Sequence, residues 1–471
     1  MLKPTLYFGV AAIFAQLGGF ILTSILTRTL SISEFAQISI LEATATATGG
    51  ICIFAIERAA QRFYFDVADS QRESIFSNAL AFSIFSVLVI ASAWIIGSFF
   101  INKSQEFLVY SIGMVCGFLL AINGLGLVYT QVTAKYWFHL LCGAIKGLFP
   151  IFIFVLISMY SSWNFKSYVV AICFTYLLLG VLAIRTLPSV RHTAIEFTQV
   201  RAMLVYSSPF IIASISASFI TVGGRFILQA FSTQEELAIY SFWFKLSLIM
   251  LLVPTAFNAA LTPKVFKLLS LRDGIRIVGL MNLPIRRMYF TSALFFLLIS
   301  PWIGLVLGGG NFGFKPLLCA LLYATHYVSS CNGAVSDLQL FHRKVTRVHS
   351  AIFLIGASLT LLVSTLFGSI LGSYGPGLGS LAGLFSITIL HHFYLSHRFN
   401  YNINIAADLV HIFIIILVGY GMSESIFFEK LFSFSFVYIH ISAVFFIIIL
   451  NLRFILIIQR ILAKSSLAMR I

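Results

Sequence analysis

Residues 138–160 read FHLLCGAIKGLFPIFIFVLISMY, an almost continuous apolar run. A helix rises 1.5 Å per residue, so about 20 apolar residues cross the hydrocarbon core of a bilayer. Within the run, Ile151-Phe-Ile-Phe-Val-Leu-Ile157 does not alternate polar and apolar residues, as a strand of a transmembrane barrel would. This stretch therefore predicts a membrane-spanning α-helix.

Runs of this kind recur along the whole chain of 471 residues, which is 60% hydrophobic, only 10% charged and has a mean hydropathy of +1.01. A soluble domain carries about 25% charged residues, so the predicted fold class is an all-α integral membrane protein of about fourteen transmembrane helices. The expected spans are residues 5–27, 35–56, 77–101, 107–131, 138–160, 167–185, 203–221, 239–261, 288–308, 315–335, 350–372, 376–397, 405–421 and 432–452.

The spans are expected to form two lobes of six helices each. The connection after the sixth span is among the longer ones and contains Pro188, which places an inter-lobe linker at 188–202, between an N-lobe at 1–187 and a C-lobe at 203–398. Residues 399–471 add two spans and a tail. A faint repeat supports the division, because the first and seventh spans each end near an Arg that is followed by a short acidic turn. Parallel repeats are typical of transporters with a substrate site between the repeats.

Positive charge alternates from one connection to the next. Of the 30 Lys and Arg residues, 22 lie in one set of connections and the two termini, and only Arg28, Lys103, Lys166, Arg225, Lys315 and Lys430 lie in the opposite set. By the positive-inside rule, both termini are expected to be cytoplasmic. A net charge of +15 distributed in this way indicates membrane topology and gives no reason to expect a nucleic-acid partner.

All six cysteines fall inside expected spans, without a CxxC pair or a ligand-like spacing with histidine. We interpret them as packing residues and expect no disulfide, metal or other cofactor. Histidines within spans are likewise interpreted as core groups with satisfied hydrogen bonds; they include His326, His391, His392 and His440. No glycine-rich phosphate loop or nucleophile motif occurs, so the chain is not expected to be an enzyme.

Basic side chains in or at the ends of spans are the candidate substrate ligands. A charge in hydrocarbon costs about 2.5–3.5 kcal/mol, so such residues are expected to face a cavity or a partner. Snorkelling to lipid headgroups is the alternative for those at span ends, but it is harder for Lys245, about six residues inside its span. The candidates are Arg28, Arg58, Arg62, Lys146, Arg225 and Lys245.

Acidic residues within spans are few. Glu42 lies seven residues into the second span and Asp408 starts the thirteenth. Glu42 has two interpretations: it neutralises Arg28 or Lys245, or it titrates in an ion-coupled cycle. Charge pairing and ion coupling are therefore both open for these two carboxylates.

Several short stretches, in order along most of the chain, carry a resemblance to a known family. They are Leu26-Thr-Arg28-Thr-Leu-Ser-Ile-Ser-Glu34-Phe-Ala, Ile56-Glu-Arg58-Ala-Ala-Gln-Arg62-Phe-Tyr, Gly224-Arg225-Phe-Ile-Leu, Glu236-Leu-Ala-Ile-Tyr240-Ser-Phe-Trp-Phe-Lys245-Leu, Ala260-Leu-Thr-Pro263 and Tyr374-Gly-Pro-Gly-Leu-Gly379. With them the chain resembles bacterial polysaccharide (O-antigen type) flippases of the multidrug/oligosaccharidyl-lipid/polysaccharide exporter superfamily. Such flippases typically carry Asp before the Arg of the seventh span, where this chain has Gly224.

The resemblance implies two lobes that form a V around a basic central cavity in the bacterial inner membrane. The implied cargo is an undecaprenyl-pyrophosphate-linked oligosaccharide, which alternating access would carry to the periplasmic leaflet for surface polysaccharide such as O-antigen or capsule. On that pattern Arg28, Arg58, Arg62, Arg225 and Lys245 would contact the headgroup. The last two spans would host the lipid tail. Other implied partners are membrane lipids, a polysaccharide polymerase and a chain-length regulator.

Two other functions remain open from the sequence. An ion-coupled multidrug or cation antiporter of the same superfamily would need buried carboxylates facing a cation, whereas the charges in these spans are mostly positive. A membrane glycosyl polymerase or ligase would need a sizeable outer loop for its catalytic groups, and the expected outer loops are short.

Overall fold

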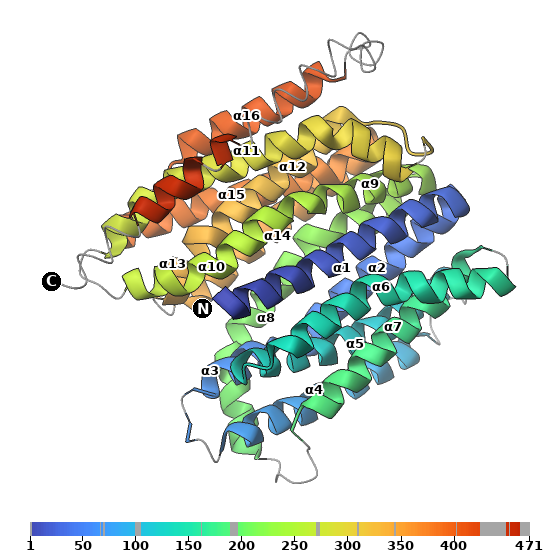
Figure 1. Cartoon of the computed structure of the whole chain (residues 1–471), viewed down its shortest axis with the longest axis horizontal. Helices are drawn as coiled ribbons and strands as arrows, with labels where there is room; N and C mark the ends of the chain where they lie inside the picture. Colours follow the sequence, from blue (N-terminus) through green and yellow to red (C-terminus); the bar gives the residue numbers. More distant parts are fainter. Residues whose placement is uncertain are drawn as a thin grey trace. The chain divides into compact units, whose positions relative to one another are not determined.

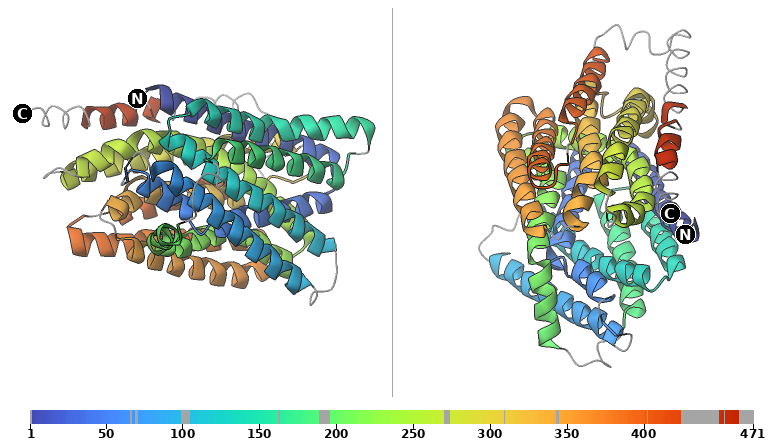
Figure 2. Two further views of the ribbon diagram at one scale, coloured as in Figure 1. Left: turned by 90° about the horizontal axis from the view of Figure 1, so that it is seen from below. Right: turned by 90° about the vertical axis from the view of Figure 1, so that its left-hand side faces the viewer.

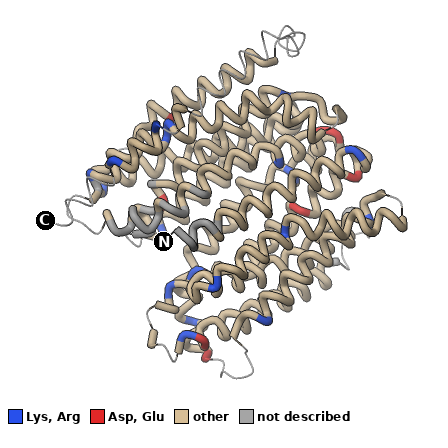
Figure 3. The backbone as a smooth tube through the Cα atoms, viewed as in Figure 1, with Lys and Arg blue, Asp and Glu red and all other residues tan. Residues whose placement is uncertain are grey.

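The computed structural model describes residues 2–65, 67–68, 71–98, 105–161, 163–188, 196–269, 274–308, 310–342, 345–401, 403–423, 449–451 and 453–461. Helices account for nearly all of this part of the chain, and no β-strand occurs in it. The predicted all-α class is therefore confirmed. Figure 3 shows that the charged residues of these helices lie mainly near helix ends, as expected for segments that cross a membrane.

The chain divides into two compact units, Met1–Phe226 and Ile227–Ile471. Within each unit the long helices run alongside one another (Figures 1 and 2). The helices of the first unit are α1 (Leu2–Thr29), α2 (Ile32–Cys52), α3 (Ile56–Phe63), α4 (Arg72–Ser98), α5 (Gln105–Val132), α6 (Tyr136–Tyr160), α7 (Phe165–Thr186) and most of α8 (Phe197–Phe231). Those of the second are α9 (Gln234–Ser247), α10 (Leu252–Leu269), α11 (Gly274–Gly308), α12 (Pro316–Cys331), α13 (Asp337–His342), α14 (Thr346–Leu371), α15 (Tyr374–Phe399) and α16 (Ile405–Gly421).

In the described residues, ten helices are long and apolar enough to cross a membrane, and an eleventh is counted if the bent pair α2–α3 is one span. The other expected spans fall on shorter helices. Each of the first thirteen expected spans therefore coincides with one helix or with a helix that contains a break. The fourteenth, 432–452, falls almost entirely outside the described residues. The protein is thus a multi-pass membrane protein.

The division between the two units falls within α8 instead of in the 188–202 linker. Most of α8 packs with the first unit: Tyr206 makes an edge-on ring contact with Phe63, and Phe226 stacks on Tyr110. The seventh span is therefore grouped with the first six in this division. The two-lobe organisation with a boundary at 188–202 stays a prediction.

The internal repeat seen in the sequence has a structural counterpart at the start of α2 and at the start of α9. Ser31 caps α2 and pairs reciprocally with Glu34, which also accepts a hydrogen bond from the backbone N–H of Phe165, at the start of α7, at 3.1 Å. Thr233 caps α9, and Glu236 accepts from the backbone N–H of Ser373, just before α15, at 2.8 Å. In both helices the acid at the third helical position therefore links the start of the helix to the start of another helix in the same unit.

Candidate functional site

The second span of the first unit is broken. Phe54 and Ala55 adopt positive φ angles of 48° and 52°, and the axes of α2 and α3 differ by 45° at this point. Two consecutive non-glycine residues in the left-handed region are costly, at about 1–3 kcal/mol each, and such strain occurs mostly at functional sites. The break separates the apolar α2 from α3, which carries Glu57, Arg58 and Arg62.

Arg58 and Arg62 lie one turn apart on α3, and both are exposed. The Arg58 guanidinium lies 5.4 Å from the ring centroid of Phe210 on α8 and 3.9 Å from the Glu57 carboxylate. Its side chain is 47% exposed, so these contacts orient the cation without enclosing it. The α3 segment thus presents two guanidinium groups, which suit bidentate binding of a phosphate.

The eighth expected span, which lies in the second unit and which the sequence repeat matches to the second span, is also interrupted. A 3₁₀ turn at Leu248–Leu251 separates α9 from α10, and Lys245 lies in the last turn of α9. In the stretch 237–247 every residue is buried except Lys245, which is partly exposed. The one position of this buried stretch that remains accessible therefore carries the positive charge.

The two breaks occur in the second and the eighth expected spans, which the sequence repeat matches to each other. In transporters built from repeats, interrupted helices at corresponding positions of the two halves point to the binding site. We therefore take the α2–α3 break with Arg58 and Arg62, and the α9–α10 break with Lys245, as the candidate site of each unit.

The remaining basic candidates differ in their surroundings. Arg28 is exposed in the last turn of α1, where it donates to the carbonyl oxygen and the hydroxyl of Ser24. Arg225 is only 5% exposed within α8, which extends well beyond the expected end of the seventh span. Its burial does not fit the snorkelling interpretation. Lys146 is exposed on α6.

The glycines beside Lys146 serve helix packing. A Cβ added to Gly147 would overlap the carbonyl oxygen of Phe14, and one added to Gly143 would lie 2.5 Å from that of Ala11. Both positions thus let α6 approach the α1 backbone closely, as small residues do between membrane helices. The sequence alone did not distinguish this role from substrate access.

Gly147→Ala is expected to destabilise the protein by about 1–3 kcal/mol, because the added methyl must separate α1 from α6. Gly19→Ala is the matched control, since a Cβ at Gly19 on the same pair of helices has no neighbour within 4 Å. Thermal unfolding of the purified variants in detergent measures both effects. Equal stabilities for the two variants would refute the packing role.

The two candidate acids are engaged within their own units. Tyr168 on α7 donates a 2.7 Å hydrogen bond to Glu42. Asp408 is 2% exposed, forms an ion pair with Arg286 and accepts a 2.6 Å hydrogen bond from Tyr327. Asp408 thus forms a buried charge pair, and ion coupling by either carboxylate stays a prediction.

Arg286 was not predicted as a site residue. The sequence placed it in a cytoplasmic connection ending at Arg287, but α11 already begins at Gly274 and Arg286 is 1% exposed within it. The helix that carries the ninth span therefore begins well before the expected start at residue 288. The Asp408 carboxylate compensates the buried guanidinium of Arg286, and Asn282 accepts a hydrogen bond from its Nε at 2.8 Å. A buried acid in an apolar span was the available signal that such a partner exists.

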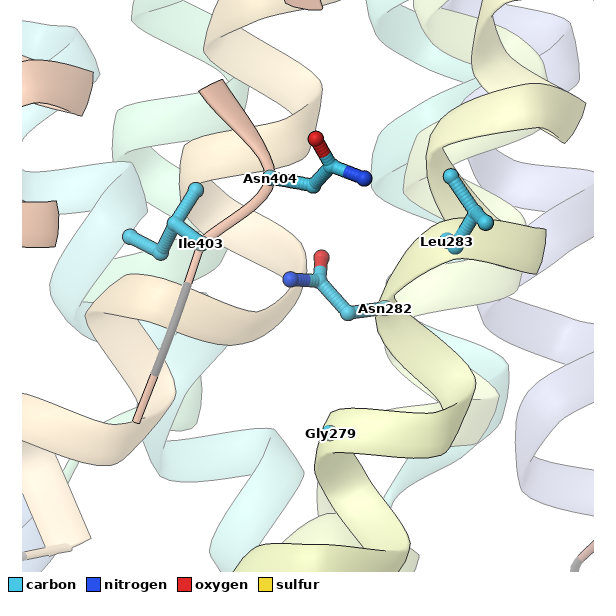
Figure 4. Close-up of a pocket in the computed structure, with 5 residues that line it drawn as sticks. All are labelled: Gly279, Asn282, Leu283, Ile403 and Asn404. Atoms are coloured by element: carbon cyan, nitrogen blue, oxygen red, sulfur yellow. The ribbon is translucent and has the colours of Figure 1, made fainter. Parts of the chain in front are cut away.

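A polar pocket borders this ion pair. It has a volume of about 410 Å³ and is lined by Gly279, Asn282, Leu283, Ile403 and Asn404. Figure 4 shows the amides of Asn282 and Asn404 facing the space between α11 and the segment that leads into α16. Because Asn282 also binds Arg286, the pocket wall is coupled to the buried charge.

Comparison of the sequence with protein-family models and with curated proteins gives no match. Comparison with solved structures does. The lipid II flippase MurJ in an inward closed conformation is 14% identical, with a TM-score of 0.67 over 97% of this chain and 99% of that one. The chain therefore has the fold of this lipid flippase.

Two structures of MATE transporters are similar over less of the chain. A MATE transporter from Vibrio cholerae has a TM-score of 0.52 at 13% identity, covering 85% of this chain and 97% of its own. An inward-facing multidrug resistance MATE family transporter of the MOP superfamily has a TM-score of 0.54 at 13% identity, covering 86% of this chain and 95% of its own. The fold is therefore shared with a lipid flippase and with a multidrug resistance transporter.

Proposed function

We propose that the protein is a flippase that carries an undecaprenyl-pyrophosphate-linked oligosaccharide from the cytoplasmic to the periplasmic leaflet of the bacterial inner membrane. The cargo would serve surface polysaccharide synthesis, with a polymerase and a chain-length regulator as downstream partners. The pyrophosphate would be held by basic side chains at the interrupted spans, and the two units would alternate access to it.

The observation that carries this proposal is the placement of Lys245. A buried helix whose accessible position is a lysine favours an anion, because the cation must compensate the hydration that the cargo loses. Arg58 and Arg62 at the break of the other unit add guanidinium groups of the kind that bind phosphate best. The similarity to a structure titled lipid II flippase supports a lipid-linked cargo.

A multidrug or cation antiporter is the second candidate, and the MATE structures support it at the level of fold. A cationic drug would need an available carboxylate. Glu42 accepts from Tyr168, and Asp408 is paired with Arg286 in a buried position. The described carboxylates within spans therefore favour this candidate less than the basic residues favour the flippase.

Deletion of the gene in its native host tests the proposal. The flippase function predicts loss of surface polysaccharide and accumulation of lipid-linked oligosaccharide on the cytoplasmic leaflet, both reversed by the wild-type gene on a plasmid. Resistance to cationic drugs should be unchanged. Intact surface polysaccharide together with new drug sensitivity would favour the antiporter instead.

Topology is a separate prediction of the same proposal. Both termini and the segment 264–287 are expected on the cytoplasmic side, because six of the seven charged residues of that segment are positive. A membrane-impermeant thiol reagent added outside should therefore miss cysteines placed at Asp273 and Ser466 but label one at Ser161. Labelling of the Asp273 site from outside would show that the topology is the opposite of the predicted one.

A further inference from the structure

Three side chains from three helices converge in the second unit, outside the candidate site. Asp337 starts α13, His349 lies in the first turn of α14, and His391 lies in the second half of α15. The Asp337 Oδ1 lies 3.6 Å from Nδ1 of His349 and 3.7 Å from Nε2 of His391. The three atoms all lie within 4.8 Å of one another.

The packing of α14 against α15 produces this convergence. A Cβ added to Gly383 on α15 would overlap the hydroxyl of Thr360 and would lie 2.5 Å from the carbonyl oxygen of Gly356, so the two backbones approach closely there. The helices are antiparallel neighbours joined by the short 372–373 turn. His349 lies about two turns before Gly356, and His391 about two turns after Gly383, so the antiparallel register places the imidazoles opposite each other.

A π-helical segment directly before Asp337 sets the position of its carboxylate. Residues Asn332–Ser336 interrupt the span between α12 and α13, immediately before Asp337. Asn332 ties this segment to α15, because its amide donates to the Leu384 carbonyl at 3.3 Å and accepts from the Thr388 hydroxyl at 3.0 Å. Thr388 lies one turn before His391. Single π-helical turns within α-helices occur frequently at functional sites.

The spacing of the three groups fits a shared ion better than direct pairing. Hydrogen bonds between nitrogen and oxygen are about 2.7–3.2 Å long, shorter than both separations here. Ligands at about 2.0–2.1 Å from a tetrahedral metal ion lie roughly 3.3 Å apart. The two imidazole rings lie 9° from parallel with their centroids 6.0 Å apart, so a bound ion would require rotations of these rings to bring the ligand atoms to that spacing.

Burial supports the same conclusion. The side chains of His391, His349 and Asp337 are 0%, 4% and 16% exposed. Neither ring nitrogen of His391 has a hydrogen-bond partner among the described residues, and the same holds for the buried side-chain atoms of Ser336 and Gln339 next to Asp337. Buried polar atoms are almost always satisfied, so this cluster has capacity for a ligand.

We propose that Asp337, His349 and His391 form a binding site for a divalent transition-metal ion of the zinc type. Two imidazoles and one carboxylate suit zinc and similar ions, whereas calcium and magnesium prefer oxygen ligands. A metal bound there would connect α13, which follows the π-helical segment, to α14 and α15. The fourth coordination position would be open to water or to another ligand.

Metal analysis of the full-length protein purified in detergent, after incubation with Zn²⁺ and removal of free ion, tests the proposal. The expected result is one zinc per chain for the wild type, with a higher unfolding temperature than after chelation. His391→Gln and His349→Gln should lose both the zinc and the stabilisation. His392→Gln is the matched control, because His392 accepts a backbone hydrogen bond from Ile403 at 3.2 Å and is outside the cluster.

A ligand exchange distinguishes metal binding from a structural role of the histidine. His391→Cys replaces one zinc ligand with another, so it should keep stoichiometric zinc, and its Co²⁺ form should show the intense charge-transfer absorption of a thiolate ligand. A wild type that retains no zinc would overturn the proposal and leave an Asp–His ion pair. Equal zinc content in His391→Gln and His392→Gln would overturn it as well.

Discussion

Asp408→Ala is expected to lower the abundance of folded protein in the membrane to a small fraction of the wild-type level. Truncating one partner of a buried ion pair leaves the other charge uncompensated, which costs about 3–5 kcal/mol. That is comparable to the whole stability of many domains. Arg286 is 1% exposed and has its ion-pair partner in Asp408, so little relaxation toward water is available to it.

Fluorescence-detected size-exclusion chromatography and thermal unfolding measure this loss. The double variant Arg286→Met, Asp408→Leu should recover most of the abundance, because it removes both charges and keeps apolar volume. Glu235→Ala is the control, since Glu235 is an exposed acid at the start of α9. Wild-type stability of Asp408→Ala would show that the buried pair does not hold α11 to α16.

Lys245→Glu is expected to abolish export of surface polysaccharide at normal membrane abundance. The substitution removes a cation that contributes about 1.5–3 kcal/mol through a charged hydrogen bond, a factor of roughly 10–150 in affinity, and it adds repulsion of the pyrophosphate. Lys245→Arg keeps the charge and should retain partial export. Lys245→Ala should lose export but be partly rescued by overexpression.

The control is Lys166→Glu, which makes the same charge change at an exposed position at the start of α7. If Lys245 instead stabilises the fold by pairing with Glu42, Lys245→Ala should lower abundance. The double variant Lys245→Ala, Glu42→Ala should then restore both abundance and export. Normal export by Lys245→Glu would exclude the phosphate role.

Apolarity explains why the positions of the spans could be predicted. Each span is fixed by its own hydrophobic length, so the thirteen expected spans that the structure describes fall on helices without knowledge of their packing. The breaks were not predictable, because Phe54 and Ala55 carry no glycine or proline signal for a left-handed turn. Tertiary packing imposes that conformation.

Partners distant in sequence were also missed. Arg286 looked like the end of a connection because its compensating acid, Asp408, lies 122 residues further along the chain. The cluster of Asp337, His349 and His391 has no ligand-like spacing, since its members come from three different helices. Lys245 could be singled out because its depth follows from the length of its own span.

Transport by the purified protein decides whether it moves a pyrophosphate-linked lipid between leaflets. The protein is reconstituted in liposomes with a fluorescent undecaprenyl-pyrophosphate-linked oligosaccharide, and the fraction of cargo accessible to an external membrane-impermeant reagent is followed over time. We expect movement between leaflets with the wild type and with Lys166→Glu, and none with Lys245→Glu. Equal rates for Lys245→Glu and the wild type, or uptake of a cationic drug without movement of the lipid, would contradict it.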